Sequence, residues 1–240
     1  MSEVPQYLRP FVLRPPSVLP VREGNLDFYL PVRDGEAPAV VLVHGGPVPE
    51  GRKPTPRDWP VYRGYGSAAA ERGLVGAVLD HRFHDFELVK EAGEDVVAAV
   101  DRVRRDPRVD SDRIGMWFFS GGGALMGNWL SQPPSWLRCV AASYPVCPTQ
   151  NELGAAAIAP SEAVRNARGL PILLSRAGLE QPDLAKWVEE FISSGREAGA
   201  DLDIIDIPQG QHAFDVLDHT DWSRAAVEEA LVWVCDHLLG

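Results

Sequence analysis

Cysteine is scarce in this sequence of 240 residues, which contains three of them (Cys139, Cys147 and Cys235). Their number is odd and their spacing is not that of a zinc site, which argues against a disulfide framework or a metal-stabilised fold. Unpaired thiols in or near a core are typical of proteins of a reducing compartment. We therefore expect a cytoplasmic protein whose stability comes from an ordinary hydrophobic core.

Basic residues and long apolar runs are also in short supply. The chain has 23 Lys and Arg against 34 Asp and Glu, a net charge of −11, so it lacks the basic face that nucleic acid or an anionic membrane requires. No apolar run approaches the roughly 18 residues of a membrane-spanning helix, and the N-terminus carries too little uninterrupted apolar sequence for a signal peptide. We therefore expect neither a nucleic-acid nor a membrane partner, and the oligomeric state stays open.

No internal repeat, low-complexity tract or long linker divides the chain, so residues 1–240 are expected to form one domain. Apolar, β-branched runs alternate with segments of helical spacing. The predicted strands are Ala39–His44, Leu74–Asp80, Arg113–Phe119, Arg138–Ser143, Pro171–Ser175 and Leu202–Ile207. The predicted helices carry the apolar stripes Val96, Val100, Val103; Leu184, Trp187, Val188, Phe191, Ile192; and Val227, Leu231, Val234, Leu238.

Strands that alternate with helices in this way predict an α/β fold, with a mostly parallel central sheet and helices on both of its faces. The first 35 residues, rich in proline, are expected to form a short antiparallel addition at one sheet edge. The stretch Tyr144–Gly169 is too long for a plain connection, and we expect it to form at most a small lid. Because ligands bind at the carboxyl ends of the strands in such sheets, the residues that directly follow each strand are the candidates for a site.

A serine stands at one of these positions. Ser120 directly follows the apolar run Ile114–Phe119 and precedes three glycines. Serine is a common N-cap, so Ser120 could do no more than cap a helix that starts near Gly121. A simple cap does not need the adjacent glycines, which favour instead a sharp strand-to-helix turn that presents the serine as a nucleophile.

A nucleophilic serine needs a base and a third group that orients the base. Both kinds of residue follow Ser120 in the expected order and after predicted strands: an acidic loop with Glu180 and Asp183, and then His212. Of the six histidines, only His212 lies between the last strand and the terminal helix, where the general base belongs. Asp183 could instead cap the helix that follows it, so Glu180 is our choice for the acid and Asp183 is the alternative.

The glycine turn at residues 44–47 (HGGP) follows the first long strand. Glycine lets the backbone approach a tetrahedral oxyanion closely, and preorganised N–H groups stabilise its charge. We expect one donor to be the amide of Gly121, directly after the nucleophile. Proline has no N–H, so the second donor is expected to be Gly46, with Gly45 and Val48 as alternatives.

Two other sequence patterns resemble binding motifs but do not indicate a binding site. His81 and His84 form an H-x-x-H pair, but further ligands at suitable spacing are lacking, so we expect no metal site. Residues 64–69 (GYGSAA) match a dinucleotide-binding pattern, but they follow a polar, proline-broken loop and not a buried strand. We therefore expect no nucleotide cofactor.

His44 precedes the two glycines at residues 45 and 46, and we interpret it as a residue that shapes their turn.

With these residues assembled, the chain resembles the dienelactone hydrolase family of the α/β-hydrolase superfamily from about residue 22 to the C-terminus. The resemblance rests on VVLVHGGP, YGSAAAERGLVGAVLDHR, EDVVAAVDRVRRDPRVDSDRIGMWFFSGGG, RAGLE and IPQGQHAFD, of which the serine region and HAFD are the most specific. It implies an α/β-hydrolase fold and hydrolysis of a small ester, thioester or lactone without cofactor or metal. It maps the family's nucleophile onto Ser120, its base onto His212 and its acid, usually aspartate, onto Glu180.

The sequence departs from the family pattern at Phe118, where glycine is expected. We expect Phe118 and Phe119 to border the substrate pocket, with Phe118 narrowing it or shifting the turn. Replacement of Phe118 by glycine would then leave the fold intact and broaden or raise esterase activity. The unusual turn also leaves two alternatives open: a non-hydrolytic cyclase, lyase or acyltransferase on the same fold, and an inactive protein that binds a small molecule.

Overall fold

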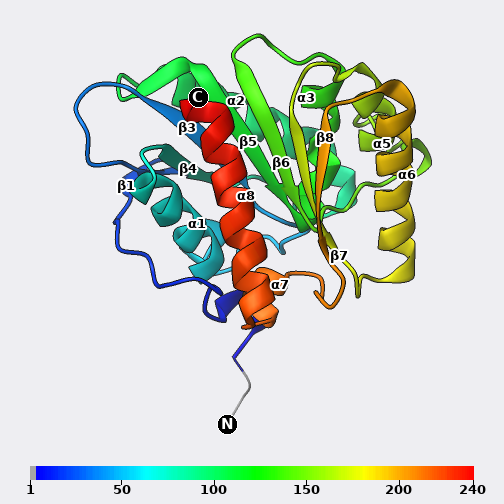
Figure 1. Ribbon diagram of the computed structural model, residues 1–240, viewed down its shortest axis with the longest axis horizontal. Helices are drawn as coiled ribbons and strands as arrows, with labels where there is room; N and C mark the ends of the chain where they lie inside the picture. The colour runs from blue at the N-terminus through cyan, green and yellow to red at the C-terminus, as the bar shows by residue number, and fades with distance from the viewer. Residues whose placement is uncertain (1–3) are drawn as a thin grey trace.

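An eight-stranded sheet runs through the molecule in the order β1-β2-β4-β3-β5-β6-β7-β8 (Figure 1). The computed structural model describes residues 4–240. The strands β3 to β8 are mutually parallel, and β1 and β2 form an antiparallel edge next to β4. The strands are β1 (Val21–Glu23), β2 (Leu26–Tyr29), β3 (Ala37–Val43), β4 (Val75–Leu79), β5 (Val109–Phe119), β6 (Leu137–Ser143), β7 (Ile172–Ala177) and β8 (Leu202–Ile207).

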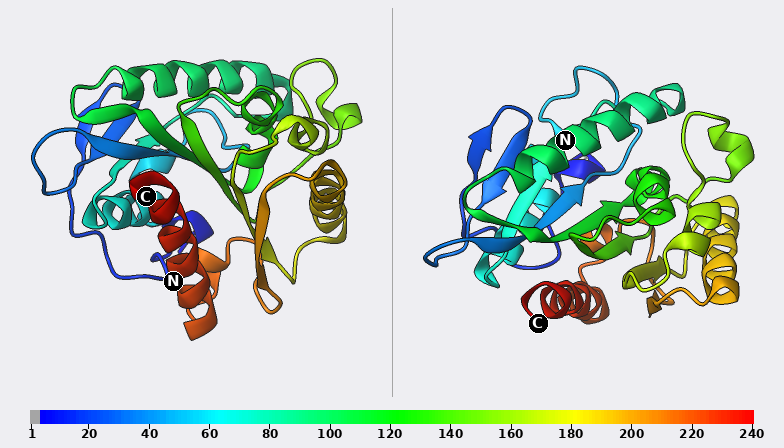
Figure 2. Two further views of the ribbon diagram at one scale, coloured as in Figure 1. Left: turned by 45° about the horizontal axis from the view of Figure 1, so that its top comes forward. Right: turned by 90° about the horizontal axis from the view of Figure 1, so that it is seen from above.

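Helices cover both faces of the sheet, and Figure 2 shows α2 and α8 on opposite sides of it. The helices α2 and α6 pack against one face, and α1 and α8 against the other, so the core has two layers. The α-helices are α1 (Pro60–Glu71), α2 (Val89–Arg104), α3 (Gly127–Ser131), α4 (Gln150–Leu153), α5 (Pro160–Ala163), α6 (Pro182–Ala198), α7 (Phe214–Leu217) and α8 (Asp221–Leu239). Short 3₁₀ helices are η1 (Gln6–Leu8), η2 (Pro56–Asp58), η3 (Phe86–Leu88), η4 (Ser120–Leu125) and η5 (Val164–Asn166).

The structure confirms all six predicted strands and the three predicted amphipathic helices, and strand ends differ by a few residues. The prediction for the residues directly after Ser120 was wrong. The helix expected from Gly121 is a 3₁₀ helix, η4, and an α-helix begins only at Gly127. Three consecutive glycines lower helix propensity, and they permit the tighter turn.

The stretch Tyr144–Gly169 does not form a lid over the carboxyl ends of the strands. Within it, α5 and η5 pack against α3 and α6, and Leu153, Ala159 and Ala163 are buried in the core. Residues 4–20, the covering N-terminal segment, lie at that end of the sheet instead, where η1 contacts α1 and α7. Phe11 and Val12 are buried there, and the backbone N–H of Val12 donates to the carbonyl oxygen of Asp215 at 2.8 Å.

The antiparallel edge predicted for the first 35 residues is present as β1 and β2, which follow this covering segment. No helix among residues 4–240 is both long enough and apolar enough to cross a membrane. The parallel strands end together near the covering segment, so the candidate site is sought there.

Candidate active site

Ser120 lies at the sharp turn between β5 and η4. Its φ is +47°, in the left-handed region that a non-glycine residue seldom occupies. Its side chain caps no helix: Phe119 is the N-cap residue of η4, and Ser120 Oγ lies 2.6 Å from His212 Nε2. The interpretation of Ser120 as a simple cap is therefore wrong.

The glycines that follow Ser120 are required by close packing. A Cβ atom on Gly121 would lie 1.9 Å from the carbonyl oxygen of Gly46, and one on Gly122 would lie 2.6 Å from that of His44. A Cβ on Gly45 would lie 2.9 Å from Ser120 Cβ. The serine turn and the glycine turn after β3 therefore pack backbone against backbone, and side chains would separate them.

Phe118 and Phe119 do not border the substrate pocket, which corrects the sequence-based prediction. Both side chains are fully buried, and they point to opposite faces of the sheet because strand residues alternate. The strand positions beside Phe118 are Val43 on β3 and Ala142 on β6. Phe118 is therefore part of the hydrophobic core, together with Val43 and Ala142.

His212 connects Ser120 to Glu180. The Nδ1–H of His212 donates a hydrogen bond to Glu180 Oε2, which leaves Nε2 free to accept from the serine hydroxyl. The Glu180 side chain is only 6% exposed, whereas Asp183 is exposed in the first turn of α6. The structure thus brings Glu180, and not Asp183, together with Ser120 and His212.

The four candidate oxyanion donors differ in whether their N–H groups are already used. The N–H of Gly45 donates to Tyr62 Oη, and that of Val48 donates to the carbonyl oxygen of Phe83, both at 2.9 Å. The N–H of Gly46 has no acceptor among the residues that the structure describes. Gly121 is in the first turn of η4, where N–H groups have no partner within the helix.

A cavity of about 240 Å³ opens above Ser120. Sequence analysis missed most of its walls, which come from the covering N-terminal segment, the glycine turn, the start of α1 and the loops after β6 and β8. It is lined by Gln6, Tyr7, Gly45, Gly46, Pro47, Val48, Trp59, Val61, Tyr62, Ser120, Tyr144, His212, Ala213 and Val216. No Lys, Arg, Asp or Glu side chain is among these lining residues.

Tyr144 had a detectable signal, because it directly follows a predicted strand, as Ser120 does. Its φ is +39°, and its ring makes an edge contact with the His212 ring at 5.1 Å between centroids. Its hydroxyl donates to both carboxylate oxygens of Asp215 at 2.8 Å, and Tyr65 Oη donates to the same carboxylate at 2.9 Å. Asp215 therefore holds Tyr144 against His212.

Asp215 is fully buried. Burial raises the pKa of its carboxyl to about 6, and the hydrogen bonds from Tyr144 and Tyr65 act in the opposite direction. Sequence analysis gave this residue no role, although it lies three positions after His212.

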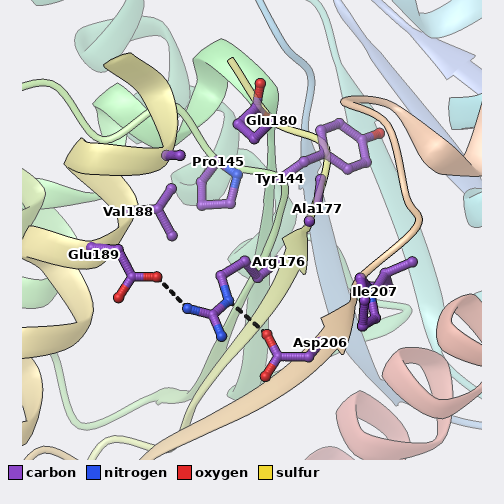
Figure 3. Close-up of a pocket in the computed structure, with 12 residues that line it drawn as sticks. Tyr144, Pro145, Arg176, Ala177, Glu180, Val188, Glu189, Asp206 and Ile207 are labelled. Carbon is purple, nitrogen blue, oxygen red and sulfur yellow. Dashed lines mark hydrogen bonds and ion pairs between the residues drawn. The ribbon is translucent and has the colours of Figure 1, made fainter. Parts of the chain in front are cut away.

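A second cavity of about 400 Å³ lies between β7, β8 and α6 (Figure 3). Glu180 and Tyr144 line it, but Ser120 and His212 do not. Figure 3 shows Arg176 bonded to Glu189 and Asp206, with Glu180 at the opposite end. The basic group in this cavity is thus already paired with two carboxylates.

His81 and His84 do not converge on a common point. His81 contacts His44, and the Nδ1 of His84 lies 2.8 Å from the carbonyl oxygen of Val48. Among residues 4–240, no group of three or more His, Cys, Asp or Glu side chains is arranged to hold a metal ion.

Comparison with solved structures finds the same fold in proteins of low sequence identity. Native esterase Est2 of the Planctomycetes species Thermogutta terrifontis matches with a TM-score of 0.68 at 17% identity, over 88% of this chain and 86% of the esterase. Dipeptidyl peptidase 4 of Porphyromonas gingivalis matches with a TM-score of 0.71 at 16% identity, over 89% of this chain. The acylaminoacyl peptidase of Pyrococcus horikoshii matches with a TM-score of 0.68 at 16% identity, over 88% of this chain.

The match covers 33% of the dipeptidyl peptidase and 40% of the acylaminoacyl peptidase, so this chain spans well under half of either peptidase. No protein-family model matches the sequence, and neither does any curated protein. The structural neighbours are esterases and serine peptidases of the α/β-hydrolase fold, and this chain has that fold, as its sequence predicted.

Proposed function

We propose that this protein is a serine hydrolase that cleaves small carboxylic esters, thioesters or lactones through an acyl-enzyme. The observation that carries the proposal is the chain of contacts from Ser120 Oγ to His212 Nε2, at 2.6 Å, and from His212 Nδ1 to Glu180. Ser120 stands in a left-handed backbone conformation that aims its hydroxyl at the base. Esterases with the same fold support the proposal.

In the first half of the reaction, Ser120 Oγ attacks the carbonyl carbon while its proton passes to His212 Nε2. Glu180 orients the imidazole and stabilises the imidazolium that forms. The tetrahedral intermediate collapses when the bond to the leaving oxygen or sulfur breaks and His212 returns the proton to that atom. In the second half, water attacks the acyl-enzyme, His212 takes its proton, and Ser120 recovers it as the acid product leaves.

The negative charge on the tetrahedral oxygen needs donors that are in place before the reaction. We assign this role to the N–H groups of Gly46 and Gly121. The N–H of Gly45 already donates to Tyr62 and that of Val48 to Phe83, which supports the choice of Gly46.

The walls of the 240 Å³ cavity favour a short, uncharged acyl group. Tyr7, Trp59, Tyr62 and Tyr144 supply aromatic surface, and the lining offers no charged group to a carboxylate or an ammonium. Structures of the Thermogutta esterase are described with propionate and with butyrate bound, which are acids of this size. On the basis of the sequence motifs, we also propose that the protein is dienelactone hydrolase-like. Because its three cysteines are buried and unpaired, we propose that it is located in the cytoplasm.

The direct test is the intact mass of the protein after incubation with a small fluorophosphonate. We expect one adduct on the wild type, no adduct on Ser120→Ala, and turnover of acetyl and butyryl esters by the wild type alone. A folded wild type that forms no adduct and hydrolyses neither ester nor lactone would contradict the proposal. It would favour a non-hydrolytic or purely binding role for the cavity.

A further inference from the structure

Two buried imidazole rings are stacked behind the glycine turn. The rings of His44 and His81 lie 3.6 Å apart between centroids, with their planes inclined by 9°. The backbone N–H of His81 donates to His44 Nε2 at 3.3 Å, and His81 Nε2 lies 3.1 Å from the carbonyl oxygen of His44. The two residues are 1% and 6% exposed, so water does not compete for these contacts.

The partners of each ring nitrogen fix where its proton is. His44 Nδ1 lies 2.6 Å from the carbonyl oxygen of Gly45, so Nδ1 carries the hydrogen and Nε2 accepts from His81. His81 Nε2 faces a carbonyl oxygen and carries the hydrogen, while its Nδ1 accepts from the N–H of Phe83 at 3.4 Å. Both rings are therefore neutral, and each has one tautomer.

The surroundings keep both rings neutral. Burial lowers the pKa of His44 to about 4 and that of His81 well below its ordinary value. The Asp80 carboxylate raises the pKa of His44, and His84 lowers the pKa of both rings. The Tyr62 ring also lies near His44, at 6.1 Å between centroids.

The hydrogen bond from His44 to the Gly45 carbonyl also determines the direction of the Gly46 amide. In a trans peptide the C=O and N–H groups point in opposite directions. Because the Gly45 oxygen is held towards His44, the N–H of Gly46 points away from it. Gly121 lies close to this amide, since a Cβ on it would be 2.8 Å from the Gly46 nitrogen.

We propose that His81 is a positioning residue for the oxyanion donor at Gly46: it fixes His44 by stacking and by two hydrogen bonds, and His44 fixes the Gly45–Gly46 peptide. This inference rests on the proposed function, because the peptide it holds carries one of the two N–H groups assigned to the oxyanion. His81 itself lines no part of the 240 Å³ cavity.

Nuclear magnetic resonance of protein labelled with ¹⁵N-histidine tests the arrangement without any assay of activity. We expect the imidazole ¹⁵N shifts to show the Nδ1–H tautomer for His44 and the Nε2–H tautomer for His81, with neither ring titrating between pH 8 and about 5. The signals are assigned from the spectra of His44→Asn and His81→Gln. The opposite tautomer in either ring, or titration of either ring in this range, would overturn the proposal.

Kinetics of His81→Phe test the consequence for the reaction. This variant keeps a ring to stack on His44 but loses the side-chain hydrogen bonds to the His44 carbonyl and the Phe83 amide. We expect kcat for a butyryl ester to fall about 10- to 100-fold with little change in KM, since a misdirected donor weakens only the transition state. The affinity for a trifluoromethyl ketone, whose adduct places an oxyanion at the site, should fall by a similar factor.

His81→Gln should recover part of the loss, because its amide can donate to the same carbonyl oxygen. His237→Gln is the matched control. The His237 ring also packs on an aromatic ring, that of Trp233, at 4.0 Å between centroids, and its Nδ1 also lies 2.8 Å from a backbone carbonyl oxygen, but it is on α8 and does not line the cavity. An active wild type whose folded His81→Phe variant keeps both kcat and inhibitor affinity would contradict the positioning role alone. A wild type without fluorophosphonate adduct or ester turnover would contradict the proposed function instead.

Discussion

At the scale of single residues, strained backbone is concentrated at the candidate site. Within residues 4–240, the non-glycine residues with positive φ are Ser120, Tyr144 and Ala213, at +47°, +39° and +61°, and all three line the 240 Å³ cavity. Such conformations cost about 1–3 kcal/mol each, and persist only where the surroundings hold them. Here the hydrogen bonds of Ser120 to His212 and of Tyr144 to Asp215 hold two of the three.

The choice of Glu180 as the acid predicts a specific loss. Glu180→Gln keeps the shape of the side chain but removes its charge, so the imidazole loses its orientation and its counter-charge. We expect kcat to fall about 10²- to 10⁴-fold with KM nearly unchanged, measured with a short-chain ester. Asp183→Asn, three residues away in the first turn of α6 and exposed, should keep wild-type kinetics; equal losses in the two variants would contradict the assignment.

The burial of Phe118 reverses the effect first expected of its replacement. Its ring is fully enclosed in the core on the α2 side of the sheet, so truncation leaves a cavity there. We expect Phe118→Ala to lower the free energy of unfolding by about 3–5 kcal/mol, measured by urea denaturation, without broadening substrate range. A variant of wild-type stability that accepts larger esters would show that the ring borders the pocket after all.

At the scale of elements, the covering N-terminal segment matters more to the site than the stretch expected to form a lid. Tyr7, on η1, lines the cavity and packs on the Trp59 ring at 4.8 Å between centroids. Farther along, the N–H groups of Ser17 and Val18 donate to Ser67 Oγ at 2.9 and 3.0 Å. The segment is therefore fastened to α1 and acts as a fixed wall.

Because Tyr7 is part of this wall, we expect its replacement by alanine to change the selectivity for acyl chain length. Tyr7→Ala removes a ring from a small cavity, so longer acyl chains gain room while butyryl esters lose contact. We expect the ratio of kcat/KM for octanoyl over butyryl esters to rise about tenfold. Leu19→Ala, on the same segment but 76% exposed, is the control and should leave the ratio unchanged. An unchanged ratio in Tyr7→Ala would exclude Tyr7 from the acyl side of the cavity.

At the scale of the whole molecule, three buried titratable groups couple stability to pH. The pKa of His44 falls from 6.5 to about 4 on folding, and that of His81 also falls, so below pH 6.5 the unfolded chain binds protons that the folded protein does not. Asp215 acts in the opposite sense: its pKa rises from 3.8 to about 6, and between these values the folded protein holds a proton that the unfolded chain releases. Two histidines outweigh one carboxyl, so acid destabilises the protein.

We expect the free energy of unfolding to fall by about 2 kcal/mol between pH 6.5 and pH 5, measured by urea denaturation at intervals of half a pH unit. In Asp215→Asn the opposing group is absent, and the fall over the same range should be steeper. The acids whose pKa values are lowered by ion pairs, such as Asp106 and Asp110, stay ionised above pH 5 and contribute little there. Stability that is constant or rises on acidification would contradict this coupling.

The sequence by itself determined the fold and the residues at the centre of the candidate site. Strand and helix periodicities are local, and a parallel sheet brings the residues that follow its strands to one edge. Ser120 and His212 could therefore be named from their order, and the acid could be narrowed to Glu180 or Asp183. Tyr144 obeys the same rule and could have been found with it.

Only the tertiary structure decided which residues surround Ser120, His212 and Glu180. Which face receives Phe118, and that the N-terminal segment covers the cavity, depend on contacts between residues far apart in the chain. The His44–His81 stack and the carboxylate of Asp215 joined to two tyrosines likewise leave no periodic or spacing signal. Order along the chain places residues at an edge of the sheet, but only packing determines which of them meet.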